Sequence, residues 1–403
     1  MSSTEGAWTN FYQGWAGFEG LLSSRPVGTR PVERPASPRA EPAGTPGRPF
    51  FSVIVTTWQR RAFLEPAVRS VLGQSVPRSD VQVIVAKGWT EETLDAWLAQ
   101  CGVETVLTSS PDQGPALAAA MARARGEVVC FLDDDDEFEP DKLAVLRAEF
   151  AKDPALVLLR HRNRNIDVEG RALPEWPSCD WPALPCARVQ ERRTDEEKAS
   201  GTTLPMHNLS TIAVRRAAVL PFVAAWTEVE AAADSLVFLS ALAASGTARA
   251  DPRVLSRRRI HASSSLENFS PAGAGPPPTL DRLQRLTRSH ARQRAMVAGT
   301  AAQRSAEWVD LILRFDAAMT SRTFPDPRVS DYLAMLRGIA RERQPFRLWV
   351  LGFALARRFS PDLAIEGWWR FCHLRHRALF PRVSYPSLFA RTPASPAPSM
   401  SNH

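Results

Sequence analysis

The 403-residue sequence is long enough for one or two globular domains, and its 44% apolar and 23% charged residues exclude a peptide or a small disulfide-stapled scaffold. The net charge of +7 is concentrated toward the C-terminus, because residues 281–380 hold 18 basic and nine acidic side chains. Five widely spaced cysteines without a CxxC pair argue against a disulfide framework and a zinc site, and favour a reducing cytoplasm.

Both ends of the chain are rich in proline and lack a helical or strand pattern. An aromatic patch near the N-terminus consists of Trp8, Phe11, Tyr12, Trp15 and Phe18. It is either a short helix that docks on the body or part of a loose tail, whereas the rest of residues 1–48 and residues 381–403 are expected to be disordered. The N-terminus has no secretory signal, and the longest proline-free apolar run, residues 348–356, is shorter than the about 20 residues that span a bilayer. We therefore expect a cytoplasmic protein that is not integral to a membrane.

From residue 49, short apolar runs alternate with amphipathic stretches, which is the pattern of βα units on a parallel sheet. The predicted strands are residues 51–57, 81–86, 103–108, 128–132, 156–160, 209–214 and 253–257. The predicted helices of this part are residues 64–72, 91–100, 114–125 and 231–244. The pattern predicts an α/β domain over residues 49–268.

The chain after residue 268 changes character. Residues 269–279 form a proline-rich linker, and residues 280–380 form a basic helical region. Its predicted helices are residues 280–297, 306–319, 329–339, 348–358 and 363–374. Arginines interleaved with aromatic residues suit peripheral contact with anionic lipid at the inner face of a membrane, although helices packed on the α/β domain with solvated arginines show the same pattern. No recognised nucleic-acid motif accompanies the charge, so no nucleic acid is expected as a partner.

Four consecutive aspartates, Asp133 to Asp136, directly follow the apolar strand predicted at residues 128–132. Adjacent carboxylates repel each other, so a folded protein tolerates them best where a cation or solvent compensates their charge. Ligands of open α/β sheets bind beyond the carboxyl ends of the strands, which is where this cluster lies. One or two carboxylates, water and a diphosphate can together complete the shell of a hard divalent ion. The alternative is a solvated turn that caps the helix starting near Pro140.

Three segments carry a resemblance to a known family: residues 52–60 (SVIVTTWQR), 68–74 and 126–143 (GEVVCFLDDDDEFEPDKL). In order and spacing they resemble the nucleotide-binding half of family 2 glycosyltransferases with the GT-A fold. The resemblance implies a GT-A-like, Rossmann-like and mostly parallel sheet flanked by helices, here followed by a helical C-terminal region. It also implies a metal-dependent inverting transferase that moves a sugar from a nucleotide-sugar donor to a hydroxyl of a glycan, lipid-linked or protein acceptor.

The resemblance assigns residues to a metal site. Asp133 and Asp135 match the Asp-x-Asp motif of the family, with Asp135 the expected direct ligand of Mn²⁺ or Mg²⁺ and Asp134 near the ribose. The ion would stabilise the departing nucleoside diphosphate as a Lewis acid. His261 matches a late His and Ser segment that folds over the diphosphate, which makes it a further metal ligand or a phosphate donor, and residues 257–259 add three arginines. A surface histidine beside arginines is the alternative.

The resemblance also suggests a catalytic base. The family places the Asp of a Glu-Asp pair at the start of a helix, and the matching helix here begins Ala233-Asp234, so Asp234 is the candidate and the Glu is missing. Its chemistry would be removal of a proton from the acceptor hydroxyl. Glu228 and Glu230 are substitutes nearby, and an Asp at a helix start is alternatively only a cap.

The nucleotide-binding segment shows both a match and a departure. Thr56, Thr57 and Arg60 match the residues that lie against the nucleotide, although an ordinary strand end and helix start would look the same. After the second strand, however, the acidic residues that read the nucleobase in the family are replaced by Ala86 and Lys87. Without an acceptor for a base N–H, discrimination among bases weakens, so the identity of the donor stays open.

Other function classes compete with the transferase. A non-catalytic GT-A-like partner or scaffold protein is suggested by Ala86, Ala118 and Ala233, and it predicts that Asp135→Ala leaves function intact. A nucleotidyltransferase would need a Gly-rich loop with an arginine after the first strand, and a dehydrogenase would need G-x-G-x-x-G after a strand; neither pattern is present. High Ala, Arg and Pro usage is typical of a GC-rich bacterium, in which a family member most often builds surface polysaccharide or another surface glycoconjugate.

Overall fold

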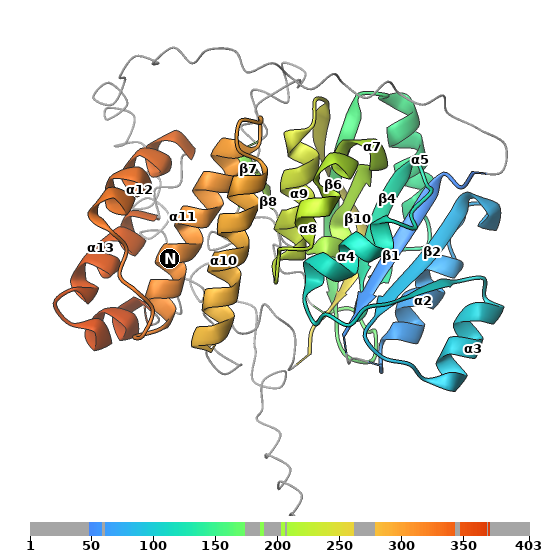
Figure 1. Cartoon of the computed structure of the whole chain (residues 1–403), viewed down its shortest axis with the longest axis horizontal. Helices are drawn as coiled ribbons and strands as arrows, with labels where there is room; N and C mark the ends of the chain where they lie inside the picture. Colours follow the sequence, from blue (N-terminus) through green and yellow to red (C-terminus); the bar gives the residue numbers. More distant parts are fainter. Residues whose placement is uncertain are drawn as a thin grey trace, which may run out of the picture.

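The computed structural model describes residues 48–58, 61–173, 186–188, 203–205, 208–261, 279–342, 347–368 and 370. Within them a β-sheet with helices on both faces forms one part, and helices from residue 280 onward pack beside it (Figure 1). The N-terminal aromatic patch, Arg60, most of the linker and the C-terminal tail, which the sequence singled out, lie outside the described residues.

The main sheet has eight strands in the order β3-β2-β1-β4-β9-β6-β10-β5. The strands are β1 (Phe51–Thr57), β2 (Val81–Lys87), β3 (Glu104–Leu107), β4 (Val128–Asp133), β5 (Glu137–Phe138), β6 (Leu156–Ile166), β9 (Ile212–Arg215) and β10 (Thr247–Arg259). Neighbours from β3 to β4 are parallel, as are β6 and β10, whereas β9 and β5 run antiparallel to their neighbours. The predicted GT-A-like, mostly parallel sheet is thereby confirmed. A separate pair joins β7 (Cys186–Arg188) and β8 (Thr203–Pro205).

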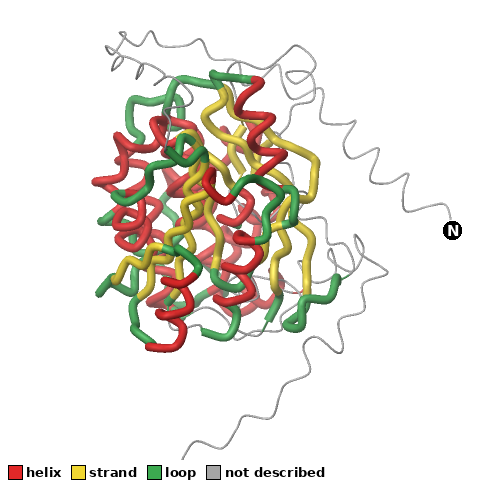
Figure 2. The backbone as a smooth tube through the Cα atoms, turned by 90° about the vertical axis from the view of Figure 1, so that its right-hand side faces the viewer, coloured by secondary structure: helices red, strands yellow, loops and turns green. Residues whose placement is uncertain are grey.

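Helices cover both faces of this sheet, and the turned view of Figure 2 shows the strands running among them. One face carries α2 (Leu64–Leu72), α3 (Glu92–Gln100) and α5 (Lys142–Lys152). The other carries α4 (Gln113–Met121), α7 (Arg216–Val219), α8 (Val223–Trp226) and α9 (Ala233–Ala243). Because the central strands are covered on both faces, β1, β2 and β4 are almost continuously apolar and buried.

The C-terminal helices are α10 (Leu280–Met296), α11 (Gln303–Thr320), α12 (Val329–Glu342) and α13 (Arg347–Arg357). Trp308, Phe315 and Val350 belong to a core that these helices form among themselves. Val309 of α11 belongs instead to the core of the α/β part. The helical region therefore has its own core and also extends the core of the sheet. Among the described residues, no helix combines the length and apolar character needed to cross a bilayer.

Three expectations about strands need correction. The strand predicted at residues 209–214 starts late, because a 3₁₀ turn, η3 (Leu209–Thr211), precedes β9. Asn208 shapes this turn: it adopts φ 65°, and its side chain accepts a hydrogen bond from the Ser210 amide at 2.9 Å. Strands β6 and β10 extend well beyond the predicted 156–160 and 253–257, because polar residues such as Arg160 and Asn163 are buried there by neighbouring strands and helices.

Candidate active site

The aspartates lie at the carboxyl end of β4, as the sequence predicts, beside the carboxyl end of β1. Because these strands are parallel neighbours, with Thr56 in register with Asp133, their last residues meet at one edge of the sheet. The Thr57 hydroxyl donates a hydrogen bond to the Asp134 carboxylate. The Asp133 amide donates to the Ser210 hydroxyl at 3.0 Å, which attaches the end of β4 to η3. The structure thus brings together four of the residues that the resemblance assigned to donor binding.

Asp135 and His261 approach each other although 126 positions separate them in the sequence. The Nε2 atom of His261 lies 2.9 Å from Oδ2 of Asp135, and only 8% and 11% of the two side chains are exposed. His261 lies two residues after the end of β10, and the centroid of its ring is 5.3 Å from that of the Phe63 ring. Among the described residues there is no cluster of three or more His, Cys, Asp or Glu side chains arranged to hold a metal ion.

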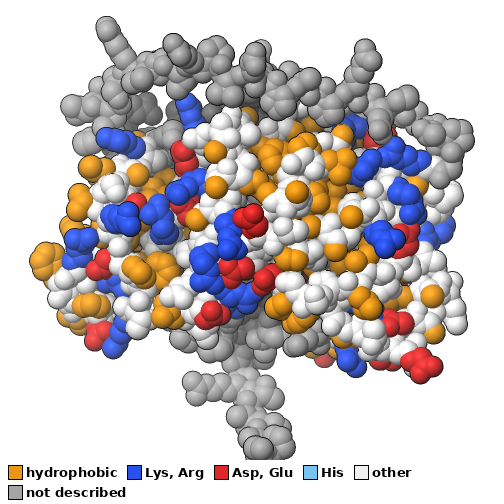
Figure 3. Space-filling model, in the orientation of Figure 1, with side chains coloured by type: hydrophobic (Ala, Val, Ile, Leu, Met, Phe, Trp, Pro, Cys, Tyr) orange, Lys and Arg blue, Asp and Glu red, His pale blue; other side chains and the backbone are white. Residues whose placement is uncertain are grey.

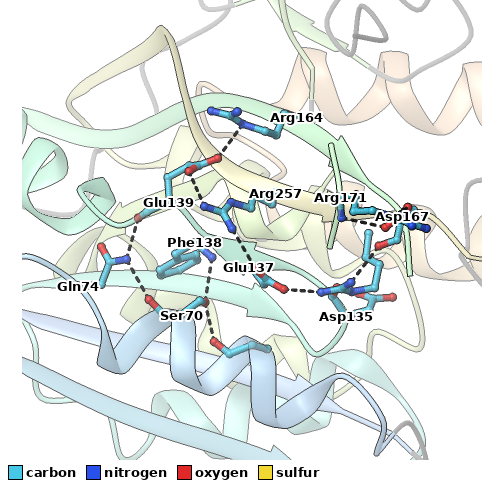
Figure 4. A network of polar contacts seen from close by, with 12 residues as sticks. Ser70, Gln74, Asp135, Glu137, Phe138, Glu139, Arg164, Asp167, Arg171 and Arg257 are labelled. Atoms are coloured by element: carbon cyan, nitrogen blue, oxygen red, sulfur yellow. Dashed lines mark hydrogen bonds and ion pairs between the residues drawn. The ribbon is translucent and has the colours of Figure 1, made fainter. Parts of the chain in front are cut away.

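The three consecutive arginines at the end of β10, residues 257–259, divide between two roles. Arg257 pairs with Glu137 and Glu139 (Figure 4). Arg259 pairs with Glu137 and donates to the Asp135 carbonyl at 3.0 Å. These two side chains therefore hold the turn after β4 in place. Arg258 acts electrostatically on the carboxylates of both Asp136 and Asp234 and lowers the pKa of each against the larger effect of burial.

Asp136 is a buried member of the aspartate cluster that is attached to β10. Its carboxylate accepts a hydrogen bond from the Arg259 amide at 3.0 Å, and its side chain is buried. Burial and the neighbouring Asp135 raise the pKa of this carboxyl to about 7. Asp136 thus attaches the cluster to β10, while Asp135 beside it faces His261.

A network behind the cluster fixes β5 and the start of α5 (Figure 4). Gln74, which follows α2, donates to the Glu139 carbonyl at 2.8 Å and accepts from the Leu143 amide at 2.9 Å. Ser70 of α2 accepts from the Phe138 amide at 2.9 Å. Both residues lie in the second segment of the family resemblance, and their contacts explain why that segment accompanies the aspartates.

Lys142 is a buried residue of the site region that the sequence analysis missed. Its ammonium donates to the Ser210 carbonyl at 2.8 Å and to the Ser256 hydroxyl at 3.2 Å, so it connects α5, η3 and β10. Burial lowers the pKa of Lys142 to about 7, against the opposing effect of nearby Asp136. A signal was available: Lys142 precedes Leu146 and Phe150 at intervals of four, which places it on the buried face of its helix.

Asp234 begins α9 and is connected to the aspartates through two residues. Its carboxylate accepts hydrogen bonds from the amides of Asn208 at 3.1 Å and Ser235 at 2.8 Å. Asn208 holds Ser210, which in turn holds Asp133. Burial raises the pKa of the Asp234 carboxyl to about 6, while the two amides and Arg258 act in the opposite direction.

Glu230, one of the two substitute bases, lies against α10. Glu230 pairs with Arg285, Arg288 and Arg292 of α10, which hold its pKa below the usual range. Figure 3 shows basic and acidic side chains gathered over α10 on this face of the molecule. Because Glu230 attaches α10 and its conjugate base is stabilised, it is a weaker candidate for a proton acceptor than Asp234.

The loop after β2, where the family's acidic residues are missing, has a distinct structure. Lys87 is fully buried, forms a 2.5 Å ion pair with Asp95 of α3, and donates to the Trp89 carbonyl at 2.7 Å. The guanidinium of Arg61 lies 4.6 Å from the centroid of the Trp89 ring. The ring of Trp58 fills the space in which a side chain at position 88 would lie, since a Cβ on Gly88 would come within 1.9 Å of it. Lys87 therefore points into the α2–α3 side of the sheet, and indole rings surround the loop.

Comparison with known proteins identifies the class of this domain. Residues 52–220 match the profile of the family described as "Glycosyl transferase family 2". An uncharacterized glycosyltransferase of Nostoc sp., alr2836, is 33% identical over 117 residues, which are 28% of this chain and 36% of that protein. Chondroitin synthase of Pasteurella multocida is 29% identical over 149 residues, 35% of this chain and 15% of that protein. The chain thus spans well under half the length of these curated relatives.

A solved structure of Staphylococcus aureus TarS, residues 1–349 in complex with UDP-GlcNAc, is also similar. Its sequence identity is 15% and its TM-score 0.48, and the alignment covers 81% of this chain and 91% of that one. The segment 52–220, which contains β1, β4 and the aspartates, carries the match to glycosyl transferase family 2 that the resemblance predicts.

Proposed function

We propose that this protein is an inverting, metal-dependent glycosyltransferase that moves a sugar from a nucleotide-sugar donor to an acceptor hydroxyl during synthesis of a bacterial surface polysaccharide or glycoconjugate. The observation that carries the proposal is the convergence of the Thr57–Asp134 and Asp135–His261 pairs from β1, β4 and the end of β10 at one edge of the sheet. The family match supports the reaction class, and the similarity to chondroitin synthase of Pasteurella multocida supports a polysaccharide product.

The residues present fit a divalent ion. A carboxylate oxygen and an imidazole nitrogen 2.9 Å apart, both nearly buried, are donors that suit Mn²⁺ or Mg²⁺. Asp135 and His261 would hold the ion, and Asp133 at the end of β4 would lie beside them. A diphosphate and water would complete the coordination shell of the ion. When bound, the ion would supply Lewis-acid stabilisation of the leaving diphosphate.

Asp234 would accept the proton of the acceptor hydroxyl. With a pKa raised to about 6, the carboxylate is largely ionised at neutral pH and yet more basic than an ordinary aspartate. Arg258, which acts on both Asp136 and Asp234, would offset the negative charge gathered between metal site and base. Attack from the side of Asp234, opposite the leaving group, would invert the anomeric centre.

The donor's base would be bound without a carboxylate. Since Lys87 pairs with Asp95 and indole rings surround Gly88, the loop after β2 offers aromatic faces to a planar base. Stacking tolerates every base because each has a π-face, so we expect weak selectivity between bases.

The acceptor would be a glycan, lipid-linked or protein hydroxyl, and the C-terminal helices would bring the enzyme to an anionic membrane surface from the cytoplasmic side. Exposed Leu333 and Phe359 lie near basic residues such as Arg337 and Arg358 in the sequence, a combination that suits peripheral binding. Sedimentation with vesicles of phosphatidylcholine, with and without phosphatidylglycerol, tests this part: binding to the anionic vesicles alone is expected, and equal or absent binding to both contradicts it.

The donor site is tested by thermal stability of the full chain against a panel of nucleoside diphosphates and nucleotide sugars, with and without Mn²⁺. A ligand at 100 times its Kd stabilises the folded state by about 2.7 kcal/mol. We expect a shift with at least one nucleotide that requires both Mn²⁺ and Asp135, and that survives in the control Asp362→Ala, whose carboxylate lies on the surface. If no nucleotide shifts the wild type, the non-catalytic partner or scaffold replaces this proposal.

A further inference from the structure

The turn that precedes Asp234 has an unusual backbone. Ala232, two positions before Asp234, adopts φ 63° and ψ 54°, the left-handed region that residues with a Cβ rarely occupy. No side chain of Ala232 can cap the helix, so α9 begins without help from its own first residue. A strained turn of this kind persists only where its surroundings hold it.

Helix α10 holds this turn through two neutral side chains. The Ser289 hydroxyl accepts hydrogen bonds from the amides of Glu230 at 3.2 Å and Ala231 at 3.0 Å. The Gln293 amide group donates to the Ala232 carbonyl at 3.1 Å and accepts from the Ser235 hydroxyl at 2.8 Å. Both α10 side chains are fully buried, so these bonds do not compete with solvent.

Helix α4 holds the same turn from the other side. The Gln113 side chain accepts from the Ala233 amide at 3.2 Å, and the Gly114 amide donates to the Val229 carbonyl at 3.1 Å. No side chain fits at position 114, because a Cβ there would come within 2.1 Å of the Trp226 carbonyl oxygen. The turn is therefore held between α4 of the α/β part and α10 of the helical region. We call the four residues that hold it, Gln113, Gly114, Ser289 and Gln293, the clamp.

We propose that Ser289 and Gln293 are positioning residues for Asp234, so that the first helix of the C-terminal region belongs to the catalytic unit. The inference rests on the proposed function, in which Asp234 is the base. Ser235 makes the connection: its hydroxyl binds Gln293 and its amide binds the Asp234 carboxylate. When Gln293 is shortened, the Ser235 hydroxyl and the Ala232 carbonyl each lose one buried partner and keep only their bond to each other at 3.0 Å and the Leu236 amide on the carbonyl. The bridge from α10 to the turn is then lost, so we expect the Asp234 carboxylate to lose its fixed direction.

Because of its electrostatic surroundings, the pKa of Asp234 indicates whether the clamp keeps the turn closed to water. Arg258 acts on it from β10, the amides of Asn208 and Ser235 bind it from η3 and α9, and α10 faces the turn with neutral Ser289 and Gln293. Arg285, Arg288 and Arg292 of α10 pair with Glu230 instead, and Arg294 pairs with Asp310. Burial dominates, so a loosened turn that admits water would lower the pKa of Asp234 toward its ordinary value.

The first test measures the clamp without any substrate. Amide hydrogen exchange of the full chain is followed for the segment 229–236 in Gln293→Ala, Ser289→Ala and the control Gln284→Ala, which removes an exposed glutamine from the same helix. We expect exchange in this segment to rise by about tenfold in the first two variants, with β1 and β4 unchanged, and no change in the control. Unchanged protection of the segment in both variants overturns the inference.

The second test measures catalysis with the nucleotide sugar selected by the thermal panel, as release of nucleoside diphosphate. We expect kcat of Gln293→Ala to fall about 10- to 100-fold with an unchanged donor KM, and the acidic limb of kcat to move to lower pH. Ser289→Thr, which keeps the hydroxyl, should retain the wild-type profile. If Gln293→Ala exchanges its amide hydrogens faster in the segment 229–236 but keeps the wild-type kcat and the wild-type pH dependence of kcat, a positioning role is refuted. If the wild type turns over no nucleotide sugar, the proposed function fails and the catalytic role of the clamp fails with it, whereas hydrogen exchange still decides whether α10 holds the turn.

Discussion

The two halves of the candidate site are built in different ways. On the donor side, the key residues follow parallel strands directly: Thr57 ends β1 and Asp133 ends β4. On the base side, Asp234 depends on Asn208, on the left-handed Ala232 and on Gln293 from a separate helical region. The donor half therefore follows from the ends of neighbouring parallel strands, whereas the base half depends on a turn that helices from two parts of the chain hold, so substitutions should damage the two halves in distinguishable ways.

The largest expected effect is on the donor side. Asp135→Ala removes the carboxylate that faces His261, so we expect diphosphate release to fall about 10³-fold, the order seen when one electrostatic stabiliser of a transition state is lost. EDTA should have the same effect on the wild type and none on the variant. Steady-state rates with Mn²⁺ check this, with Asp362→Ala as control. Activity retained within tenfold would remove Asp135 from the site.

The second-largest effect is expected when the candidate base, Asp234, is replaced. Asp234→Asn should lower kcat about 10²- to 10⁴-fold, the range of general-base contributions. The wild-type kcat should rise with pH through about 6, because the carboxylate must be ionised to accept a proton. Rate measurements from pH 5 to pH 8 check this, and an acidic limb that persists in the variant contradicts the assignment.

The free energy of unfolding tests the role of Asp234 independently of catalysis. Its folded pKa lies above the ordinary value, so the folded state binds a proton more tightly than the unfolded state, and this group lowers stability as pH rises from about 4 through 6. Asp234→Asn, which has no charge to bury, should therefore melt no lower than the wild type at pH 7. A Tm several degrees lower would show that the carboxylate serves the fold rather than catalysis.

A smaller effect, on the pH dependence of stability, is expected for Lys142, which connects α5 with η3 and β10 between the two halves of the site. Its folded pKa of about 7 lies below the ordinary value for lysine, so between pH 7 and about 10 the unfolded state binds more protons and stability should rise with pH. One such group contributes up to about 1.4 kcal/mol per pH unit. Urea unfolding at pH 7 and pH 9 should show this rise, and it should shrink in Lys142→Met. An equal rise in both proteins assigns the dependence to other groups.

The smallest effect is expected for the ion pairs between α10 and the turn. Glu230→Gln weakens pairs with partly exposed arginines, which are worth less than about 1 kcal/mol. Urea unfolding and kcat should both stay close to the wild-type values. A large loss of activity would mean that charge, rather than the buried hydrogen bonds of Ser289 and Gln293, holds the turn.

The first half of the fold could be predicted closely from the sequence. The expected strand at residues 51–57 coincides with β1, and the expected helix at residues 64–72 coincides with α2. Strands buried on both faces must be apolar throughout, so their pattern can be recognised without knowledge of their neighbours. The same pattern located the aspartates, because the residues after such a strand emerge at the binding edge.

The second half could not be predicted as well, since its polar residues are buried by partners far away in the chain. Residues 209–211 were expected as strand and form a 3₁₀ turn, because the side chain of Asn208 satisfies the Ser210 amide. The long β6 and β10 carry arginines and asparagines that local patterns assign to the surface, whereas ion pairs and strand neighbours bury them.

The sequence by itself determined the α/β class, the parallel strands and the aspartates at their ends, because burial on both faces of a sheet dictates residue type position by position. Only the tertiary structure decided which partners the arginines of residues 257–259 take, that Lys142 is buried, and that Ser289 and Gln293 hold the turn before Asp234. The physical reason is that a polar side chain has no preferred partner in sequence: its role depends on which donor or acceptor the fold brings within hydrogen-bond distance.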